Sequence, residues 1–197
     1  MDRETIAVYD AKFEDYVKLT ETLTPGAALL RFINAVPPGG SVLDLGCGPG
    51  EAARAMAVAG LDATALDASQ GMISLVQKIP NVTAVHADFD WLDQQGAFDG
   101  IWANFALLHT NRDTFPRYLD AIAKALKPGG IFHLGMKTGE GAHRDAMGRF
   151  YVYFTRSEFE MMLLERGFEI LHVKEGEEKG LAGSVDPFIL MLTRLAD

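Results

Sequence analysis

A glycine-rich turn of sequence GCGPG occupies residues 46–50, between an apolar run at 42–45 and an alanine-rich stretch that starts at Glu51. A strand that ends at glycines and leads into a helix brings backbone close to a ligand, with helix N–H groups facing it. The dinucleotide spacing Gly-x-Gly-x-x-Gly fails because Glu51 takes the third glycine position. A carboxylate there repels a pyrophosphate and tolerates a cation. The turn therefore predicts a nucleotide-like ligand that carries positive charge.

Acidic residues close the next two expected strands. Asp67 follows the apolar run at 63–66, where its carboxylate can accept hydrogen bonds from ribose hydroxyls. Asp67 can also be the N-cap of the following helix, and the two roles are compatible. Asp88 follows the third expected strand, at 82–86. These positions predict that the ligand lies across the ends of neighbouring strands.

His109 is the candidate general base, because it follows the fourth expected strand at the end where open α/β sheets place their ligand crevice. The alternative is that it caps or packs against the next helix. His133 lies inside an expected strand and is predicted to be a hydrogen-bonded core residue. His86 and His172 are also in strands, and His143 is predicted to be solvated.

The elements that must position these residues alternate along the chain. Strands are expected near 42–45, 63–66, 82–86, 98–103, 131–136, 168–173 and 188–193, and helices over 51–59, 72–79, 115–126 and 155–167. The last helix opens with a capping box from Thr155 to Glu158. Two further helices, over 9–20 and 27–36, precede residue 41, and residues 137–148 form a polar segment with glycines. This order predicts an α/β fold with a mostly parallel sheet and helices on both faces.

The sequence around these motifs resembles the class I S-adenosylmethionine-dependent methyltransferases. The glycine turn with Asp44, the segment from Asp67 through Ala68 to Met72, the pair Asp88-Phe89, and the run from Phe98 to Asn104 each match a motif of that family. The resemblance implies a Rossmann-like seven-stranded sheet in the order 3-2-1-4-5-7-6, with strand seven antiparallel.

The resemblance also implies which residues hold the cofactor S-adenosylmethionine. Tyr9 is expected to close over it from an N-terminal helix, with ordinary helix packing as the alternative. The full expected set is Tyr9, Asp44, Gly46, Cys47, Gly48, Gly50, Asp67, Ala68, Met72, Asp88, Phe89 and Asn104.

The activity implied is transfer of the methyl group to an O, N, S or C atom of a small molecule, with release of S-adenosylhomocysteine. The reaction is an in-line displacement, so alignment is the enzyme's main contribution. A base such as His109 is needed only for a hydroxyl or ammonium acceptor. The alternatives are an NAD(P)-dependent oxidoreductase, which Glu51 disfavours, and a non-catalytic S-adenosylmethionine-binding protein.

The acceptor side is expected to come from the N-terminal helices and residues 137–154. Lys137, Arg144 and Arg149, with Tyr151 and Tyr153, are candidates to bind an anionic or planar acceptor. A solvated loop with packed tyrosines is the alternative interpretation.

Length and composition set the remaining expectations. The 197 residues predict one domain, 1–197, with residues 1–40 as N-terminal helices that form a cap and 41–197 as the core. A net charge of −9 disfavours nucleic acid as a partner. The single cysteine, Cys47, supports neither a disulfide nor a zinc site, and no metal is expected. No window suggests a membrane span, which favours a cytoplasmic protein, and a homodimer is possible.

Overall fold

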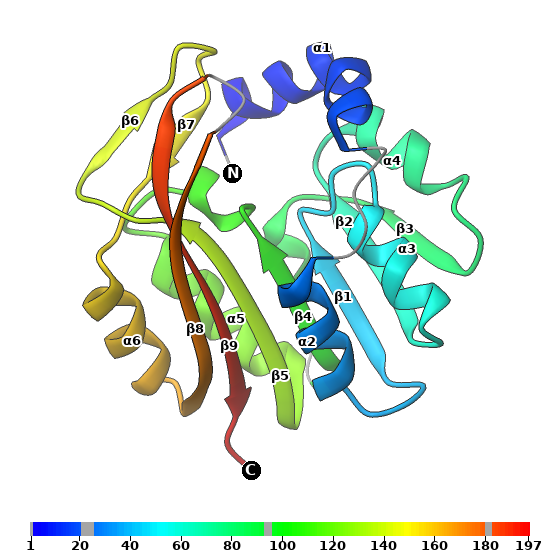
Figure 1. The fold of residues 1–197 in the computed structure, drawn as a ribbon. Coiled ribbons are helices and arrows are strands. Elements are labelled where there is room, and N and C mark those ends of the chain that lie inside the picture. Colours follow the sequence, from blue (N-terminus) through cyan, green and yellow to red (C-terminus); the bar gives the residue numbers. More distant parts are fainter. Residues whose placement is uncertain (1, 21–25, 93–95, 180–182) are drawn as a thin grey trace.

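A computed structural model of the chain describes residues 2–20, 26–92, 96–179 and 183–197 (Figure 1). Its centre is a seven-stranded sheet in the order β3-β2-β1-β4-β5-β9-β8. The strands are β1 (Ser41–Leu45), β2 (Asp62–Asp67), β3 (Val82–His86), β4 (Phe98–Asn104), β5 (Leu126–Lys137), β8 (Phe168–Lys179) and β9 (Val185–Leu195).

Strands β3, β2, β1, β4 and β5 are parallel, and β9 runs antiparallel between β5 and β8. This is the expected Rossmann-like order with an antiparallel seventh strand. The two remaining strands, β6 (Ala142–Arg144) and β7 (Phe150–Val152), form a separate hairpin and do not enter the sheet.

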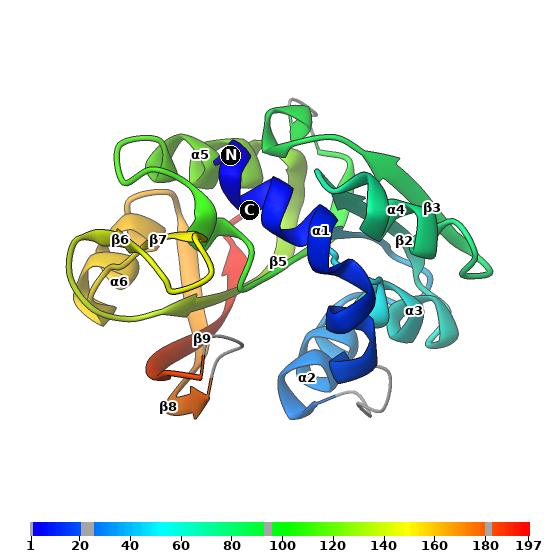
Figure 2. The same ribbon diagram turned by 90° about the horizontal axis from the view of Figure 1, so that it is seen from above.

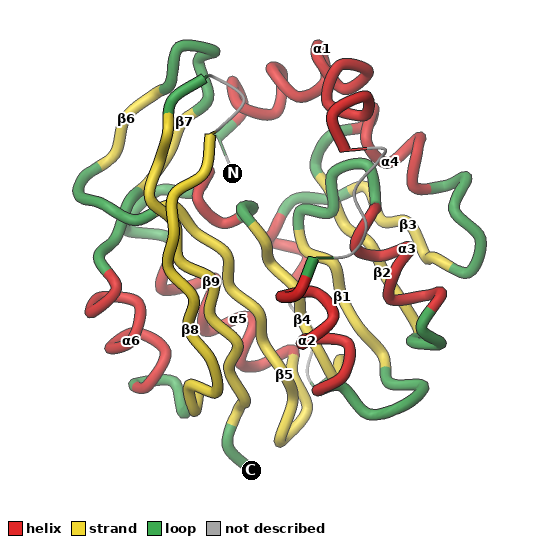
Figure 3. The backbone as a smooth tube through the Cα atoms, viewed as in Figure 1, coloured by secondary structure: helices red, strands yellow, loops and turns green. Residues whose placement is uncertain are grey.

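Helices cover both faces of the sheet (Figure 3). They are α1 (Arg3–Thr20), α2 (Ala27–Ala35), α3 (Glu51–Val58), α4 (Gln70–Val76), α5 (Phe115–Ala125) and α6 (Arg156–Leu164), with short 3-10 turns η1 (Phe89–Leu92) and η2 (Leu107–His109). The expected capping box at the start of α6 is present, with Thr155 and Glu158 bonded reciprocally. Thr114 is the N-cap residue of α5, and its side chain makes no cap bond.

The apolar stripes of these helices divide the core in two. On one face, α5 and α6 bury Phe115, Leu119 and Phe159 in a large cluster with β4, β5 and β9. On the other, Phe32 of α2 and Met56 of α3 pack with side chains of β1, β2, β4 and β5. Each fully buried side chain of this size contributes about 1.5–3 kcal/mol, so both layers hold the sheet.

The segment at 137–148, expected to be irregular, forms part of the β6–β7 hairpin. Asp145 closes this hairpin because its Oδ1 accepts hydrogen bonds from the backbone N–H groups of Met147 and Arg149. Strands of three residues are too short for an alternating pattern, which is why the sequence did not predict them.

Element ends also differ from expectation. Helix α1 begins at Arg3, ahead of Tyr9, because Asp2 accepts hydrogen bonds from both the backbone and the hydroxyl of Thr5. Strand β5 begins at Leu126, ahead of the expected 131–136, and its pairing with β4 has a register shift between Phe98 and Gly100. Strands β8 and β9 extend beyond the expected 168–173 and 188–193.

The two N-terminal helices take different positions. Helix α1 crosses above the carboxyl ends of the central strands, from the β6–β7 side to the α4 side (Figure 2). Helix α2 packs on a face of the sheet through Leu29 and Phe32. Of the two helices expected to form a cap, α1 therefore lies over the carboxyl ends of the strands, where the ligand was predicted.

Candidate active site

A pocket lies at the carboxyl ends of the parallel strands, under α1. Its empty space, including the open mouth, is about 550 Å³. It is lined by Thr5, Ile6, Tyr9, Gly46, Gly48, Asp67, Ser69, Met72, Phe89, Asn104, Phe105 and Ala106.

The glycine turn forms one wall as backbone. Gly46 and Gly48 have φ of +73° and +53°, which a side chain disfavours. A Cβ on Gly46 would also stand 2.4 Å from the Cβ of Ala106, so glycine is required there on two counts. The N–H groups of Gly46 and Cys47 donate to the Leu66 carbonyl, which ties the turn to β2.

Asp67 joins this turn to the start of α4. Its Oδ2 accepts from the Gly48 N–H at 2.9 Å, and its Oδ1 accepts from the Ser69 N–H at 2.8 Å. The N-cap of α4 is Ser69, whose Oγ accepts from the Met72 N–H, so the alternative role of Asp67 as N-cap is wrong. Burial raises the pKa of Asp67. The carboxylate lines the pocket and has acceptor capacity left for a ligand.

Asp44 lies behind the turn and does not line the pocket. It is buried, and its Oδ2 accepts from the Ala53 N–H at 3.0 Å, which fixes the start of α3 against β1. Burial raises its pKa to about 7. Asp44 therefore orders the turn, and a nearby cation would favour its ionised form.

Met72 and Phe89 supply apolar walls, and both are buried. The Ser69 Oγ donates to Oδ1 of Asp10 at 2.5 Å, which links α4 to α1. Asn104 lies at the end of β4, where its Oδ1 is 3.1 Å from Nε2 of His133. The pocket thus combines an apolar slot with a few polar groups at its ends.

Besides Asp44, four expected residues lie outside this lining. The Cys47 side chain is buried in the cluster of α3 and α4, and burial raises the pKa of its thiol. Gly50 caps α3, and a Cβ on it would contact Ile79 at 2.7 Å. The Ala68 carbonyl bonds to His86, and exposed Asp88 accepts from the Asp90 N–H. Gly50 and Asp88 therefore have evident local structural roles.

Tyr9 enters the pocket from α1 and is held by two side chains. Its hydroxyl is 3.0 Å from Nε2 of His109 and 3.3 Å from a guanidinium nitrogen of Arg149. His109 is buried, and its Nδ1 is 2.7 Å from the Phe150 carbonyl. Because a carbonyl only accepts, Nδ1 carries the proton and Nε2 accepts from Tyr9. Burial lowers the pKa of His109 to about 4.

The pocket also has residues that sequence reasoning missed. Phe105 lines it with φ of +54°, a strained conformation for an aromatic residue, and its N–H donates to the Gly135 carbonyl. Thr5 and Ile6 enter from the first turns of α1. No sequence pattern predicts a phenylalanine with positive φ. Thr5 and Ile6 were missed because the first helix was expected to begin at residue 9.

The basic residues proposed for an acceptor are paired with acids. Lys137 bonds to Asp186, Arg144 to Asp2, and buried Arg149 to Asp145. Tyr151 and Tyr153 are buried, so the packing alternative is correct for them. His143 is exposed, as expected, and its ring also stacks on Tyr153 and bonds to the Tyr153 hydroxyl.

Among the residues that the structure describes, no cluster of three or more His, Cys, Asp or Glu side chains could hold a metal ion. None of the described helices is long and apolar enough to cross a membrane.

Fold and site together define a Rossmann-like domain that binds a nucleoside-containing ligand on a glycine turn and an acidic strand end. A family model for a methyltransferase domain matches residues 20–173. The chain therefore belongs to the family of class I S-adenosylmethionine-dependent methyltransferases. Membership of this family argues against the alternative that the protein is an NAD(P)-dependent oxidoreductase.

Similar proteins agree with this assignment. A cypemycin N-terminal methyltransferase from a Streptomyces species is 36% identical over 136 residues, which cover 65% of this chain and 56% of the relative. The chain spans about half the length of the curated relatives it matches.

Two solved structures share the fold over nearly the whole chain. The first is Burkholderia thailandensis 1,6-didemethyltoxoflavin-N1-methyltransferase, with bound 1,6-didemethyltoxoflavin and S-adenosylhomocysteine. Its identity is 24% and its TM-score is 0.73, and the match covers 100% of this chain and 91% of that chain. The second is DhpI in complex with SAH. It is 25% identical with a TM-score of 0.70, and the match covers 98% of this chain and 95% of that chain.

Proposed function

We propose that this methyltransferase acts on a small-molecule acceptor and that the acceptor atom is a nitrogen that attacks in its uncharged form. The proposal rests on which titratable groups line the pocket. Among the described lining residues these are Tyr9 and Asp67. Neither is a ready general base, because Tyr9 has its pKa raised by burial and Asp67 is engaged with the turn.

The lining residues fit S-adenosylmethionine. Asp67 would accept from the ribose hydroxyls, Met72 and Phe89 would enclose the adenine, and the Gly46–Gly48 backbone would pass close to the amino acid part. Asp44 would keep the turn ordered from behind. When bound, this cofactor supplies an electrophilic methyl group on a sulfonium.

Tyr9 is positioned to act as a lid residue. Its hydroxyl donates to His109 and accepts from Arg149, and these two contacts hold Tyr9 in the lining of the pocket. His109 then orients Tyr9, and its lowered pKa makes it a poor base.

A nitrogen acceptor accords with this chemistry. A neutral amine attacks without prior deprotonation, whereas a hydroxyl requires a base in the transition state. The name of one similar protein, 1,6-didemethyltoxoflavin-N1-methyltransferase, gives N1 as the methylated atom, and that of another places the methyl group at the N-terminus of cypemycin. We take small amines and nitrogen heterocycles as the acceptor class.

The test is release of S-adenosylhomocysteine across a panel of small molecules in matched pairs, each amine beside the alcohol of the same skeleton. We expect turnover with members of the amine series and little with the alcohols. Turnover confined to alcohols would overturn the nitrogen assignment. Cofactor binding without turnover on any acceptor class would instead favour the non-catalytic S-adenosylmethionine-binding protein.

Other features stay predictions from the sequence. These are a cytoplasmic location, the lack of a nucleic-acid partner, the possible homodimer, and the division into a cap over 1–40 and a core over 41–197. Sedimentation of the purified chain would measure its oligomeric state.

A further inference from the structure

A second pocket lies on the face of the sheet that carries α2, and it shares no residue with the first. The N-terminal turn of α2 forms one side, and β5, β9 and β8 form the floor. Its empty space, including the open mouth, is about 590 Å³, and its lining is Gly26, Ala27, Ala28, Arg31, His133, His172, Lys174, Leu190 and Leu192.

The charge of this lining is opposite to that of the whole chain. The chain carries a net −9, yet the lining contains Arg31 and Lys174 and no aspartate or glutamate. Most basic residues that the structure describes are ion-paired, whereas Arg31 and Lys174 pair with no described acid. Two cationic side chains that pair with none of the described acids favour an anionic ligand.

The start of α2 adds to this preference. Its N-cap is Gly26, so no side chain caps the first turn. The first N–H groups of a helix have no partner within the helix, and the helix dipole makes this end positive. Ala27 and Ala28 both line the pocket. A carboxylate placed here would meet backbone donors as well as the two cations.

His133 is the feature that indicates an organic ligand with a donor group. Its side chain is 2% exposed, and its ring stacks on Trp102 at a centroid distance of 3.6 Å. Burial lowers its pKa to about 3, so the ring is neutral. Nε2 donates to Oδ1 of Asn104 at 3.1 Å. Nδ1 is then an acceptor, and it makes no hydrogen bond to any residue the structure describes.

We infer that this second pocket binds a small organic carboxylate whose apolar body carries a hydroxyl or amine donor. The carboxylate lies at the start of α2 beside Arg31 and Lys174, and the donor bonds to Nδ1 of His133. The apolar body packs on Leu190 and Leu192, which favours an organic acid over inorganic phosphate.

The probe is 4-hydroxybenzoate, titrated into the full chain by calorimetry beside benzoate, phenol and phosphate. Benzoate lacks the donor and phenol lacks the carboxylate, so each should bind about 3- to 10-fold more weakly than 4-hydroxybenzoate. Phosphate should bind more weakly still. No binding of 4-hydroxybenzoate at millimolar concentration, or equal binding of all four probes, would overturn the inference.

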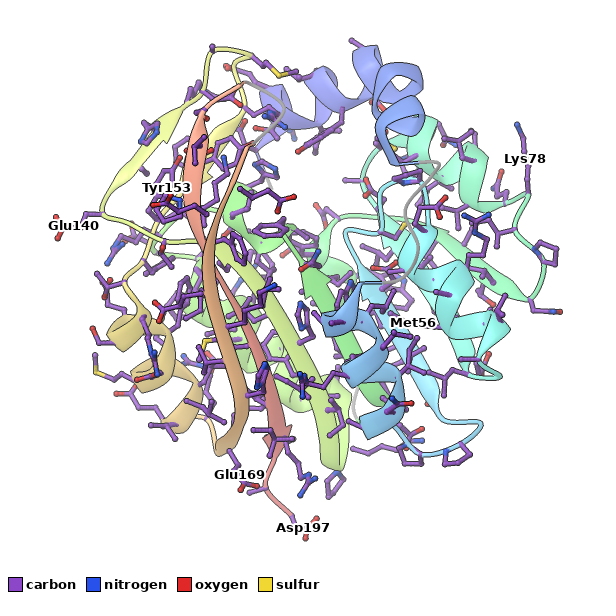
Figure 4. The ribbon with its side chains drawn as sticks, in the orientation of Figure 1. Met56, Lys78, Glu140, Tyr153, Glu169 and Asp197 are labelled. Carbon is purple, nitrogen blue, oxygen red and sulfur yellow. The ribbon has the colours of Figure 1, made fainter. Side chains whose placement is uncertain are left out.

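Two surface variants test whether 4-hydroxybenzoate binds in the second pocket. Lys174→Gln should weaken 4-hydroxybenzoate by about 3-fold. Lys78→Gln removes the same charge from a residue that points outward beyond α4 (Figure 4), and it should leave the affinity unchanged. Equal effects of the two variants would show that only net charge matters, and would refute the site. Asp67→Ala should not alter probe binding, which separates this pocket from the methyl-donor pocket.

His133 gives the sharpest measurement. The nitrogen NMR shift of its Nδ1 should move on addition of 4-hydroxybenzoate and much less with benzoate. In His133→Phe, checked for folding by circular dichroism, the two probes should bind equally. If the Nδ1 shift does not change on addition of 4-hydroxybenzoate, the proposed hydrogen bond from the ligand to His133 is refuted. These readouts need no methyl transfer, so their failure is distinct from failure of the proposed activity.

Discussion

In the proposed donor site, Asp67 contacts both the glycine turn and the start of α4. We expect Asp67→Ala to weaken binding of S-adenosylhomocysteine by about 10- to 100-fold, through loss of charge-assisted hydrogen bonds. Calorimetry measures the change. Asp62→Ala, at the exposed start of the same strand, is the matched control. An unchanged affinity in folded Asp67→Ala would remove Asp67 from the site.

His109 was the candidate base, and its contacts favour a positioning role. We expect His109→Gln to weaken donor or acceptor binding by about 3- to 10-fold while kcat is largely retained. Because the pKa of His109 is lowered to about 4, its titration should produce no inflection near pH 6.5 in kcat/KM. A loss of kcat by about 100-fold or more would restore His109 as the general base.

At the scale of elements, α1 is held over the pocket by hydrogen bonds to the β6–β7 hairpin at its beginning and to the start of α4 through Asp10. The Phe150 N–H donates to the Thr5 hydroxyl at 2.9 Å, and Arg144 bonds to Asp2 through both of its terminal nitrogens. Neutral hydrogen bonds contribute about 0.5–1.5 kcal/mol each. A helix docked in this way can open locally without unfolding the core.

This docking predicts the behaviour of Thr5→Val, which preserves shape and removes the hydroxyl. We expect faster amide hydrogen exchange over residues 3–11 and release of S-adenosylhomocysteine that is about 3- to 10-fold faster. Thr83→Val on exposed β3 should change neither. Unchanged exchange and release in Thr5→Val would show that α1 is held by other contacts.

For the whole molecule, buried Asp44 makes stability depend on pH. Its folded pKa is raised to about 7 from an ordinary 3.8, so its contribution is fully present below about pH 4 and is lost as the pH rises through 7. His109 acts oppositely. Its pKa is lowered to about 4 from 6.5, so its contribution is present above about pH 6.5 and is lost as the pH falls through 4.

The variant Asp44→Asn separates the two effects. Asparagine can still accept from the Ala53 N–H and does not ionise. From pH 5 to pH 8, we expect the wild-type free energy of unfolding to fall relative to that of Asp44→Asn by on the order of 2 kcal/mol. Urea denaturation at both pH values measures this difference. Asp62→Asn is the exposed control, and parallel curves for all three proteins would contradict the assignment.

The sequence by itself determined the parts of this protein that local patterns encode. Apolar runs and helical periodicity predicted the order of strands and helices, and the glycine turn with Asp67 predicted the place of the ligand. These features rest on neighbouring residues, since the pleat, the helical repeat and a positive φ at glycine are local properties. The order of the sheet came from the family resemblance and was confirmed.

Only the tertiary structure decided which side chains meet across the pocket. The contact of His109 with Tyr9 joins residues 100 positions apart, and that of Thr5 with Phe150 spans 145. Likewise, the acids that neutralise Lys137 and Arg144 come from β9 and from the residue before α1. Such contacts depend on how whole elements pack, and no local pattern records them. The sequence therefore predicted the glycine turn and Asp67, which line the first pocket, whereas the contacts of His109 and the second pocket required the fold.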